Sequence, residues 1–120
     1  MPLAAWSEIR GNLFVTSYER TDMATLIVSY PAAEGMGFDR EYYLATHISL
    51  VRAAWGECGL QSVEALFPAP GAQPFACVTL LRFSDQTGID AALSSARTAE
   101  VVGDVRNFTQ VQPAIFRAGD

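Results

Sequence analysis

Residues 38–58 read FDREYYLATHISLVRAAWGEC, and this stretch predicts the helix around which the rest of the chain is organised. Asp39 is a good N-cap residue, and Phe38 before it can pack on Tyr43 as a hydrophobic staple. Gly59 should end the helix, because glycine readily takes the left-handed conformation that follows a last helical turn. At about 100° per residue, a single arc of this helix carries its apolar side chains and one histidine: Tyr43, Leu44, His47, Ile48, Leu50, Val51, Ala54, Trp55 and Cys58.

The histidine in this arc, His47, is the only one in the chain. It is either a core residue bonded to the main chain, to Asp104 or to Asn107, or the acid/base group of a pocket. A buried imidazole costs free energy unless its nitrogens find partners, and leucine would pack at that position without this cost. We therefore expect at least one ring nitrogen to face a cavity that holds solvent or ligand.

Four β-rich runs accompany the helix, at residues 24–30, 60–67, 75–83 and 109–116. Each is bounded by glycine, proline or polar residues, as strands usually are, although the run at 60–67 is short enough to be helical instead. Pro113 lacks the N–H that a central strand would donate, so the last strand should lie at a sheet edge or carry a bulge.

The sequence between the β-rich runs at 75–83 and 109–116 is typical of helices. Ser84 and Asp85 supply an N-cap for a second helix, and further helical turns are expected over 97–105, interrupted at Gly103. The resulting order of elements, β–α–β–β–α–β, predicts a ferredoxin-like α+β domain. Two right-handed crossovers then put both helices on one face of a four-stranded antiparallel sheet.

Apolar residues stand on both faces of the first and third predicted strands, which does not suit a sheet with one face in water. We therefore expect a homodimer in which two sheets pack face to face as a dimeric α+β barrel. The domain should span residues 23–117, with a short tail at 118–120. Residues 1–22 form an N-terminal extension, which is either a loosely held tail or an arm on the second subunit.

Composition excludes several classes of function. The net charge of −5 argues against nucleic acid and anionic lipid as partners. No apolar run is long enough to span a membrane and no signal peptide is evident, so a cytoplasmic location is expected by elimination. The absence of lysine excludes Schiff-base chemistry, and one histidine cannot build a multi-histidine metal site within one chain. Cys58 and Cys77 are interpreted as reduced core residues, and no cofactor or metal is expected.

Two motifs carry a resemblance to a known family: FDxxYYxxxHxxLV at 38–51, followed by Trp55 and a Gly-Leu pair at 59–60, and DVxNFTxxxP at 104–113. Together they resemble the EthD family, which is named after a component of ethyl tert-butyl ether degradation and belongs to the dimeric α+β barrel superfamily. The resemblance covers residues 23–117. Ser49 departs from the pattern, because a proline is common there, and we expect serine to restore ordinary helical hydrogen bonding.

The resemblance implies a fold and a dimer more firmly than an activity. Members of the superfamily include cofactor-free oxygenases of polyketide quinols, haem-degrading enzymes, and decarboxylases or dehydratases of aromatic compounds. We interpret His47 as the acid/base group of an apolar pocket, with ligand contacts from Tyr30, Tyr43, Trp55 and Phe108. Packing explains each of these four as well: a strand-end aromatic, a staple and two core residues.

Three functions follow from this site. The first is cofactor-free oxidation, dehydration or decarboxylation of an aromatic or polyketide-like metabolite, with His47 moving the proton. The second is a non-catalytic ligand-binding protein or accessory subunit of an oxygenase system. Haem binding through His47 is the third and would need a ring-sized cavity. Asp104 and Asn107 are interpreted as capping residues, one of which could orient His47, and Tyr42 as a surface or lid residue.

Overall fold

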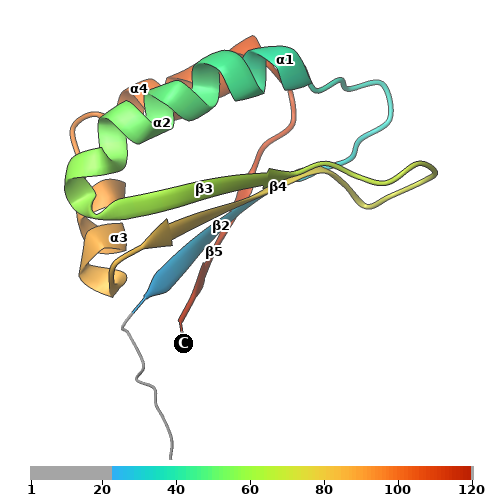
Figure 1. Ribbon diagram of the computed structural model, residues 1–120. Helices are drawn as coiled ribbons and strands as arrows, with labels where there is room; N and C mark the ends of the chain where they lie inside the picture. Colours follow the sequence, from blue (N-terminus) through green and yellow to red (C-terminus); the bar gives the residue numbers. More distant parts are fainter. Residues whose placement is uncertain (1–22, 120) are drawn as a thin grey trace, which may run out of the picture.

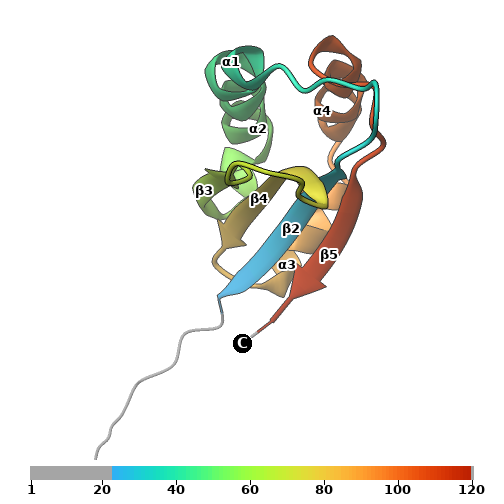
Figure 2. The same ribbon diagram turned by 90° about the vertical axis from the view of Figure 1, so that its right-hand side faces the viewer.

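The computed structural model describes residues 23–119, in which four strands form one antiparallel sheet. The sheet order is β3-β4-β2-β5, with β5 at one edge (Figures 1 and 2). A long helical segment and α4 (Thr98–Asp104) cover one face of this sheet. The ferredoxin-like α+β fold predicted from the sequence is therefore confirmed. The strands are β2 (Ala24–Pro31), β3 (Leu60–Leu66), β4 (Phe75–Phe83) and β5 (Ala114–Ala118).

The long helical segment follows the predicted range and is built from four pieces. It begins where the Asp39 side chain accepts the N–H of Tyr42 at 3.0 Å, and the Phe38 ring lies 5.1 Å from the Tyr43 ring, so the predicted cap and staple are confirmed. It ends at Gly59, whose φ of 90° is left-handed. The pieces are α1 (Arg40–Tyr42), the π-helical turn η1 (Tyr43–His47), α2 (Ile48–Trp55) and the 3₁₀ turn η2 (Gly56–Cys58).

Ser49 lies in the α-helix α2, so the ordinary helical structure expected there is confirmed, but a π-helical turn precedes it. The Ile48 N–H bonds to the carbonyl of Tyr43, five residues back, and only from Ile48 onward is the helix regular. A π turn holds more residues than an α turn, so side chains four positions apart lie more nearly above one another. Accordingly the Tyr43 and His47 rings stack, with centroids 5.3 Å apart and planes inclined by 20°. Leu44, expected in the apolar arc, is exposed.

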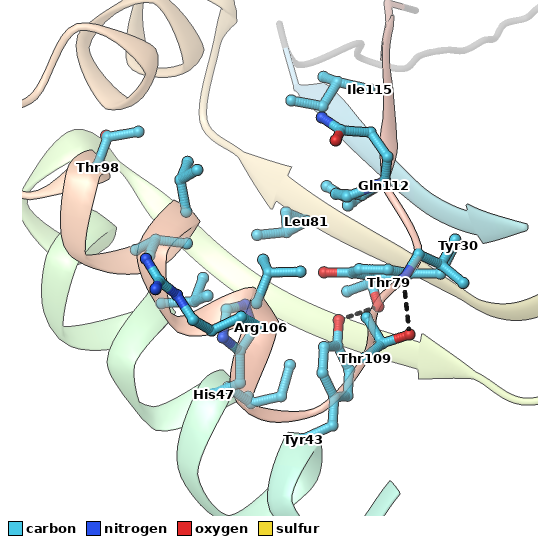
Figure 3. A pocket seen from close by; sticks show the side chains of 18 of the residues that line it. Tyr30, Tyr43, His47, Thr79, Leu81, Thr98, Arg106, Thr109, Gln112 and Ile115 are labelled. Atoms are coloured by element: carbon cyan, nitrogen blue, oxygen red, sulfur yellow. Dashed lines mark hydrogen bonds between the residues drawn. The ribbon is translucent and has the colours of Figure 1, made fainter. Parts of the chain in front are cut away.

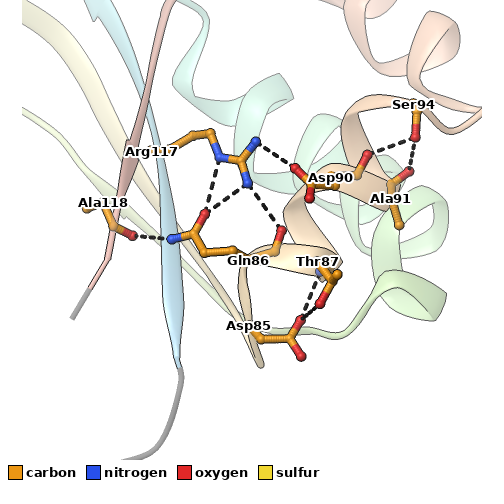
Figure 4. A network of polar contacts seen from close by, with 9 residues as sticks. Asp85, Gln86, Thr87, Asp90, Ala91, Ser94, Arg117 and Ala118 are labelled. Atoms are coloured by element: carbon orange, nitrogen blue, oxygen red, sulfur yellow. Dashed lines mark hydrogen bonds and ion pairs between the residues drawn. The ribbon is translucent and has the colours of Figure 1, made fainter.

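The main core lies between the long helical segment, α3 (Gln86–Leu93) and the covered face of the sheet. Asp85 caps α3 as predicted, accepting the Gly88 N–H at 2.9 Å. On the outer side of this helix, Arg117 of β5 pairs with Asp90 at 2.8 Å and bonds to Gln86 (Figure 4). These contacts fix α3 against the edge strand. The core includes Leu26, Val51, Trp55, Leu81, Phe83 and Ile89.

Two predicted boundaries were wrong. Gly103 does not interrupt the last helix, because α4 runs through it to the 3₁₀ turn η3 (Val105–Asn107). The last strand was expected at 109–116 but begins at Ala114. Thr109 instead forms an isolated bridge with Phe38, and its hydroxyl donates to the Gly37 carbonyl at 2.8 Å. Residues 109–113 are held by these contacts and join no strand ladder. The last strand lies at a sheet edge, one of the two outcomes predicted, since β5 pairs with β2 alone, but Pro113 lies just before this strand and is not part of its ladder.

The other face of the sheet carries a row of apolar side chains. Ile27 of β2 pairs with Leu80 of β4 and with Phe116 of β5, and Phe116 is 63% exposed. Val78 and Leu66 form the neighbouring pair, and no helix among residues 23–119 covers this face. We call this surface the open sheet face. The proposed N-terminal extension, residues 1–22, lies outside the described residues. No helix in the described chain is long and apolar enough to cross a membrane.

Candidate functional site

A cavity of about 370 Å³ lies between the long helical segment, α4, the segment after η3 and the covered face of the sheet (Figure 3). This volume is in the range of small-molecule sites and corresponds to about a dozen water molecules. Most of its wall is aliphatic. The aliphatic lining comprises Val28, Ile48, Val51, Leu81, Leu93, Val101, Val102, Val105, Val111 and Ile115.

His47 lines this cavity from the helical side and is only 3% exposed. Its Nδ1 lies 2.8 Å from Oδ2 of Asp104, and within residues 23–119 its Nε2 has no hydrogen-bond partner. A carboxylate accepts hydrogen bonds, so the neutral ring carries its proton on Nδ1 and keeps a lone pair on Nε2. Burial lowers the pKa of His47 below its ordinary value, although Asp104 acts in the opposite direction. The ring is therefore neutral at physiological pH and suited to accept a proton.

Asp104, at the end of α4, is the centre of a small polar network. Besides His47, it accepts the Tyr42 hydroxyl at 2.6 Å and the Asn107 amide at 2.9 Å. Burial would raise the pKa of the Asp104 carboxyl, but these hydrogen bonds outweigh it and the pKa lies below its ordinary value. Asp104 is thus a carboxylate that fixes the imidazole, as carboxylates hydrogen-bonded to the far nitrogen of a working histidine do in many sites. Tyr42, expected at the surface, is half-buried in this network.

Three buried hydroxyl groups stand on the cavity wall, and we call Tyr30, Tyr43 and Thr79 the hydroxyl cluster. The Tyr43 and Thr79 oxygens lie 2.5 Å apart, and the Tyr30 ring meets the Tyr43 ring edge to face at 5.8 Å. Figure 3 shows the two tyrosines extending into the cavity beside Thr79. Burial raises the pKa of Tyr43 to about 12 and that of Tyr30 further still. Both hydroxyls are therefore neutral hydrogen-bond donors.

The structure brings most of the predicted site residues together. His47, Tyr30, Tyr43 and Trp55 all line the cavity, and the Trp55 indole donates to Thr98 at 3.0 Å. Phe108 lies behind the site instead. Its ring centroid is 4.6 Å from that of His47, and it is absent from the lining found within the described chain.

Several site residues were missed or only partly anticipated from the sequence. In the sequence, nothing distinguished Thr79 beyond its place in a strand. Asp104 was interpreted as a capping residue that could also bond to or orient His47, and the structure shows that bond. Polar side chains that also line the cavity were not anticipated: Arg106, Thr109, Gln110 and Gln112. Among residues 23–119, no three His, Cys, Asp or Glu side chains gather as a metal site would require. The chemistry that this geometry supports is proton transfer at His47 beside neutral hydroxyl donors.

Comparisons with known proteins support the family resemblance. No family model and no curated relative matches the chain. An EthD-like protein from Ralstonia eutropha JMP134 has a solved structure with a TM-score of 0.71 and 27% sequence identity, over 82% of this chain and 92% of that one. The structure of an EthD family protein from Bacillus halodurans C-125 has a TM-score of 0.63 and 20% sequence identity, over 82% of this chain and 98% of that one.

More distant structures show the fold alone. SnoaB, a cofactor-independent oxygenase from Streptomyces nogalater, has a TM-score of 0.58 and 12% identity, over 81% of this chain and 93% of its own. A further structure is that of a dimeric protein of unknown function with a ferredoxin-like fold, from Bacteroides fragilis NCTC 9343. Its TM-score is 0.55 and its sequence identity is 10%, over 82% of this chain and 96% of its own. The resemblance stated from the sequence is thus confirmed, and the chain is EthD-like over four fifths of its length.

Proposed function

We propose that this protein binds an aromatic or polyketide-like metabolite in the cavity and that His47 transfers a proton to and from it without a cofactor. One observation carries the proposal. The Nδ1 of His47 is fixed by Asp104, while its Nε2 has no partner in the described chain and the ring lines an apolar cavity. A buried nitrogen without a partner costs free energy unless solvent or ligand meets it. A ligand with an acidic hydrogen would both satisfy Nε2 and react with it.

Three reactions begin or end with such a proton transfer. In an oxidation, Nε2 removes a proton from a phenol or an activated ring carbon, and the electron-rich anion then reduces dioxygen. In a dehydration, the electron pair left on carbon expels hydroxide from the neighbouring carbon. In a decarboxylation, carbon dioxide leaves a β-keto acid and the imidazolium returns a proton to the resulting enolate. In each case the ligand's own conjugated system holds the charge, so no cofactor is required.

SnoaB lends support to the first reaction, because a protein of this fold is a cofactor-independent oxygenase. That likeness concerns the fold, so it leaves the choice among the three reactions open. The mostly aliphatic lining favours an apolar ligand, whichever reaction follows.

A ligand-binding or accessory protein without catalysis is the second candidate. The observation that favours it is the scarcity of reactive groups at the cavity: apart from His47 and Arg106, its lining in the described chain carries no charged or strongly basic side chain. In this case His47 would donate or accept one hydrogen bond to the ligand, and Asp104 would only fix the ring.

The test measures turnover of hydroxyaromatic and β-keto compounds as dioxygen uptake, release of carbon dioxide, or loss of water by mass spectrometry. His47→Gln should leave the protein folded and abolish turnover, because glutamine hydrogen-bonds but does not accept a proton at neutral pH. Leu44→Gln is the matched control, since Leu44 is exposed on the same helical segment and should matter little. Full turnover in His47→Gln would refute the role of His47. Ligand binding without turnover in the wild type would favour the second candidate.

We also propose that the chain works as a homodimer joined through the open sheet face. Its exposed apolar side chains, with Phe116 at the edge, are what a second copy of the same sheet would bury. The neighbour from Bacteroides fragilis is a dimeric protein, which supports a dimer of this fold. The choice of the open sheet face as the interface rests on its exposed apolar side chains. The N-terminal extension at residues 1–22 and a cytoplasmic location stay predictions from the sequence.

A further inference from the structure

The hydroxyl cluster has more O–H donors than hydrogen bonds among its own members. Tyr43 and Thr79 each carry one O–H, and the single hydrogen bond that joins them uses only one of the two protons. The other contact of the Thr79 hydroxyl in the described chain is the Cys77 sulfur at 3.6 Å, and a thiol sulfur is a weak acceptor. Tyr30 adds a third O–H to the same wall, and its side-chain hydrogen bond with Tyr43 uses one more proton, so two hydrogen bonds share three protons. At least one strong donor on this wall is therefore left for an acceptor from within the cavity.

Because the cluster is buried, a donor without an acceptor indicates a site for a ligand. Tyr30, Tyr43 and Thr79 are each 2% exposed, so bulk water does not satisfy them. The cluster lies on the wall of a mostly aliphatic cavity, where an unsatisfied polar group is costly. Such a pattern is typical of ligand sites, in which a few polar groups orient a mostly apolar molecule.

We propose that the hydroxyl cluster binds the oxygen of a phenolic ligand, held between the sheet and His47 with its aromatic ring in the aliphatic part of the cavity. This inference rests on the proposed function for the reacting group and names the class of ligand that the site takes. Thr79 and Tyr30 are then ligand-binding residues that determine specificity.

The arrangement suits the proton transfer. When Nε2 of His47 takes the phenol proton, the O–H bond breaks and its electron pair stays on the ligand oxygen. The neutral O–H groups of the cluster then donate to this anion, in the manner of an oxyanion hole. Because burial raises the pKa of Tyr43 to about 12, its hydroxyl keeps its own proton while the ligand loses one.

The test compares the binding of 2-naphthol and naphthalene, which differ only in the hydroxyl group, by fluorescence titration of the full chain. Wild type should bind 2-naphthol about three to ten times more tightly, the value of one net hydrogen bond. The triple variant Tyr30→Phe/Tyr43→Phe/Thr79→Val removes every hydroxyl of the cluster, because removing Thr79 alone would free the Tyr43 O–H to take its place. It should reduce this ratio to about one and leave the affinity for naphthalene within about twofold. Tyr30→Phe/Tyr43→Phe, which keeps the Thr79 hydroxyl, should restore the ratio. If the triple variant does not fold, the wild-type ratio still decides, because equal binding of the two compounds overturns the inference.

Thr109→Val is the matched control, because Thr109 also lines the cavity but its hydroxyl is committed to the Gly37 carbonyl and the Val111 N–H. This variant should keep the wild-type ratio. Equal binding of the two compounds by wild type, no binding of either up to its solubility limit, or a ratio that survives in the triple variant would each overturn the inference. Turnover is scored separately. If wild type binds both compounds equally while His47→Gln loses turnover, this inference alone is refuted. If the ratio is lost in the triple variant while His47→Gln keeps full turnover, the proposed function alone is refuted.

Discussion

Replacing Asp104 by asparagine tests the pairing on which the proposed chemistry depends. The substitution keeps the size of the side chain and removes its charge. In the wild type, Oδ2 of Asp104 lies 2.8 Å from Nδ1 of His47, and the other oxygen accepts hydrogen bonds from Tyr42 and Asn107. Because the chain has a single histidine, the imidazole signals of an untagged sample belong to His47 without further assignment.

Two effects follow from these contacts. A neighbouring opposite charge raises the pKa of a histidine. Losing the Asp104 charge should therefore lower the pKa of His47 further, on top of the lowering that burial already causes. Three donors converge on the carboxylate, and the asparagine NH₂ would face at least one of them. The free energy of unfolding should consequently fall by about 1–3 kcal/mol.

Nitrogen-15 NMR reports both the tautomer and the pKa of the imidazole, and urea unfolding reports the stability. Wild type should show the proton on Nδ1 at neutral pH, whereas Asp104→Asn should shift the proton toward Nε2 and titrate at lower pH. Asp90→Asn is the control, because Asp90 pairs with Arg117 on the outer surface. A wild-type ring protonated on Nε2 would refute the assignment of His47 as a base, and so would an unchanged pKa in Asp104→Asn.

Three further predictions concern stability and assembly. The pKa of His47 is lowered on folding, so the folded state is favoured when the imidazole is neutral. This contribution to the free energy of unfolding should be complete above about pH 6.5 and lost as the pH falls through the pKa of His47 in the folded state. Urea unfolding of His47→Gln should lack this part of the pH dependence. Gly88→Ala should lower the free energy of unfolding by about 1–3 kcal/mol, because a Cβ there would overlap the Cys58 carbonyl oxygen. Gly103→Ala, in open space on α4, should raise it by about 0.5–1 kcal/mol, and equal unfolding midpoints would contradict both. Phe116→Glu should convert the proposed dimer to a monomer in light scattering, and a wild type that is monomeric at micromolar concentration would refute the dimer.

The fold was predictable because its signals are local. Asp39 and Asp85 cap helices in the structure as the sequence indicated, and the β4 boundaries were predicted to the residue. Errors arose where a tertiary contact competes with a local pattern. Thr109 looked like the start of a strand, but its bond to Gly37 holds it against the segment before the long helix. The π-helical turn has no counterpart in a periodicity analysis that assumes a constant turn.

The site was predictable only in part for the same reason. His47 and Tyr43 share one helical arc, so their proximity follows from spacing along the chain. The pairing of His47 with Asp104 joins residues 57 positions apart, and the pairing of Tyr43 with Thr79 joins residues 36 apart. Nothing local distinguishes Thr79 from other strand threonines. Strand register and the packing of α4 decide these contacts, and both are properties of the folded chain.

The surroundings of His47 bear on whether it is merely a core residue. Its ring is held on three sides, by the stacked Tyr43 ring, by the Phe108 ring at 4.6 Å and by the Asp104 carboxylate at Nδ1. A histidine that only filled space would gain most from partners on both nitrogens. Here the aromatic contacts and the carboxylate fix the orientation of the ring, while the remaining nitrogen has no partner within residues 23–119. Fixing one edge of an imidazole and leaving the other for a ligand is the arrangement that proton transfer requires, because the base must be oriented before the ligand arrives.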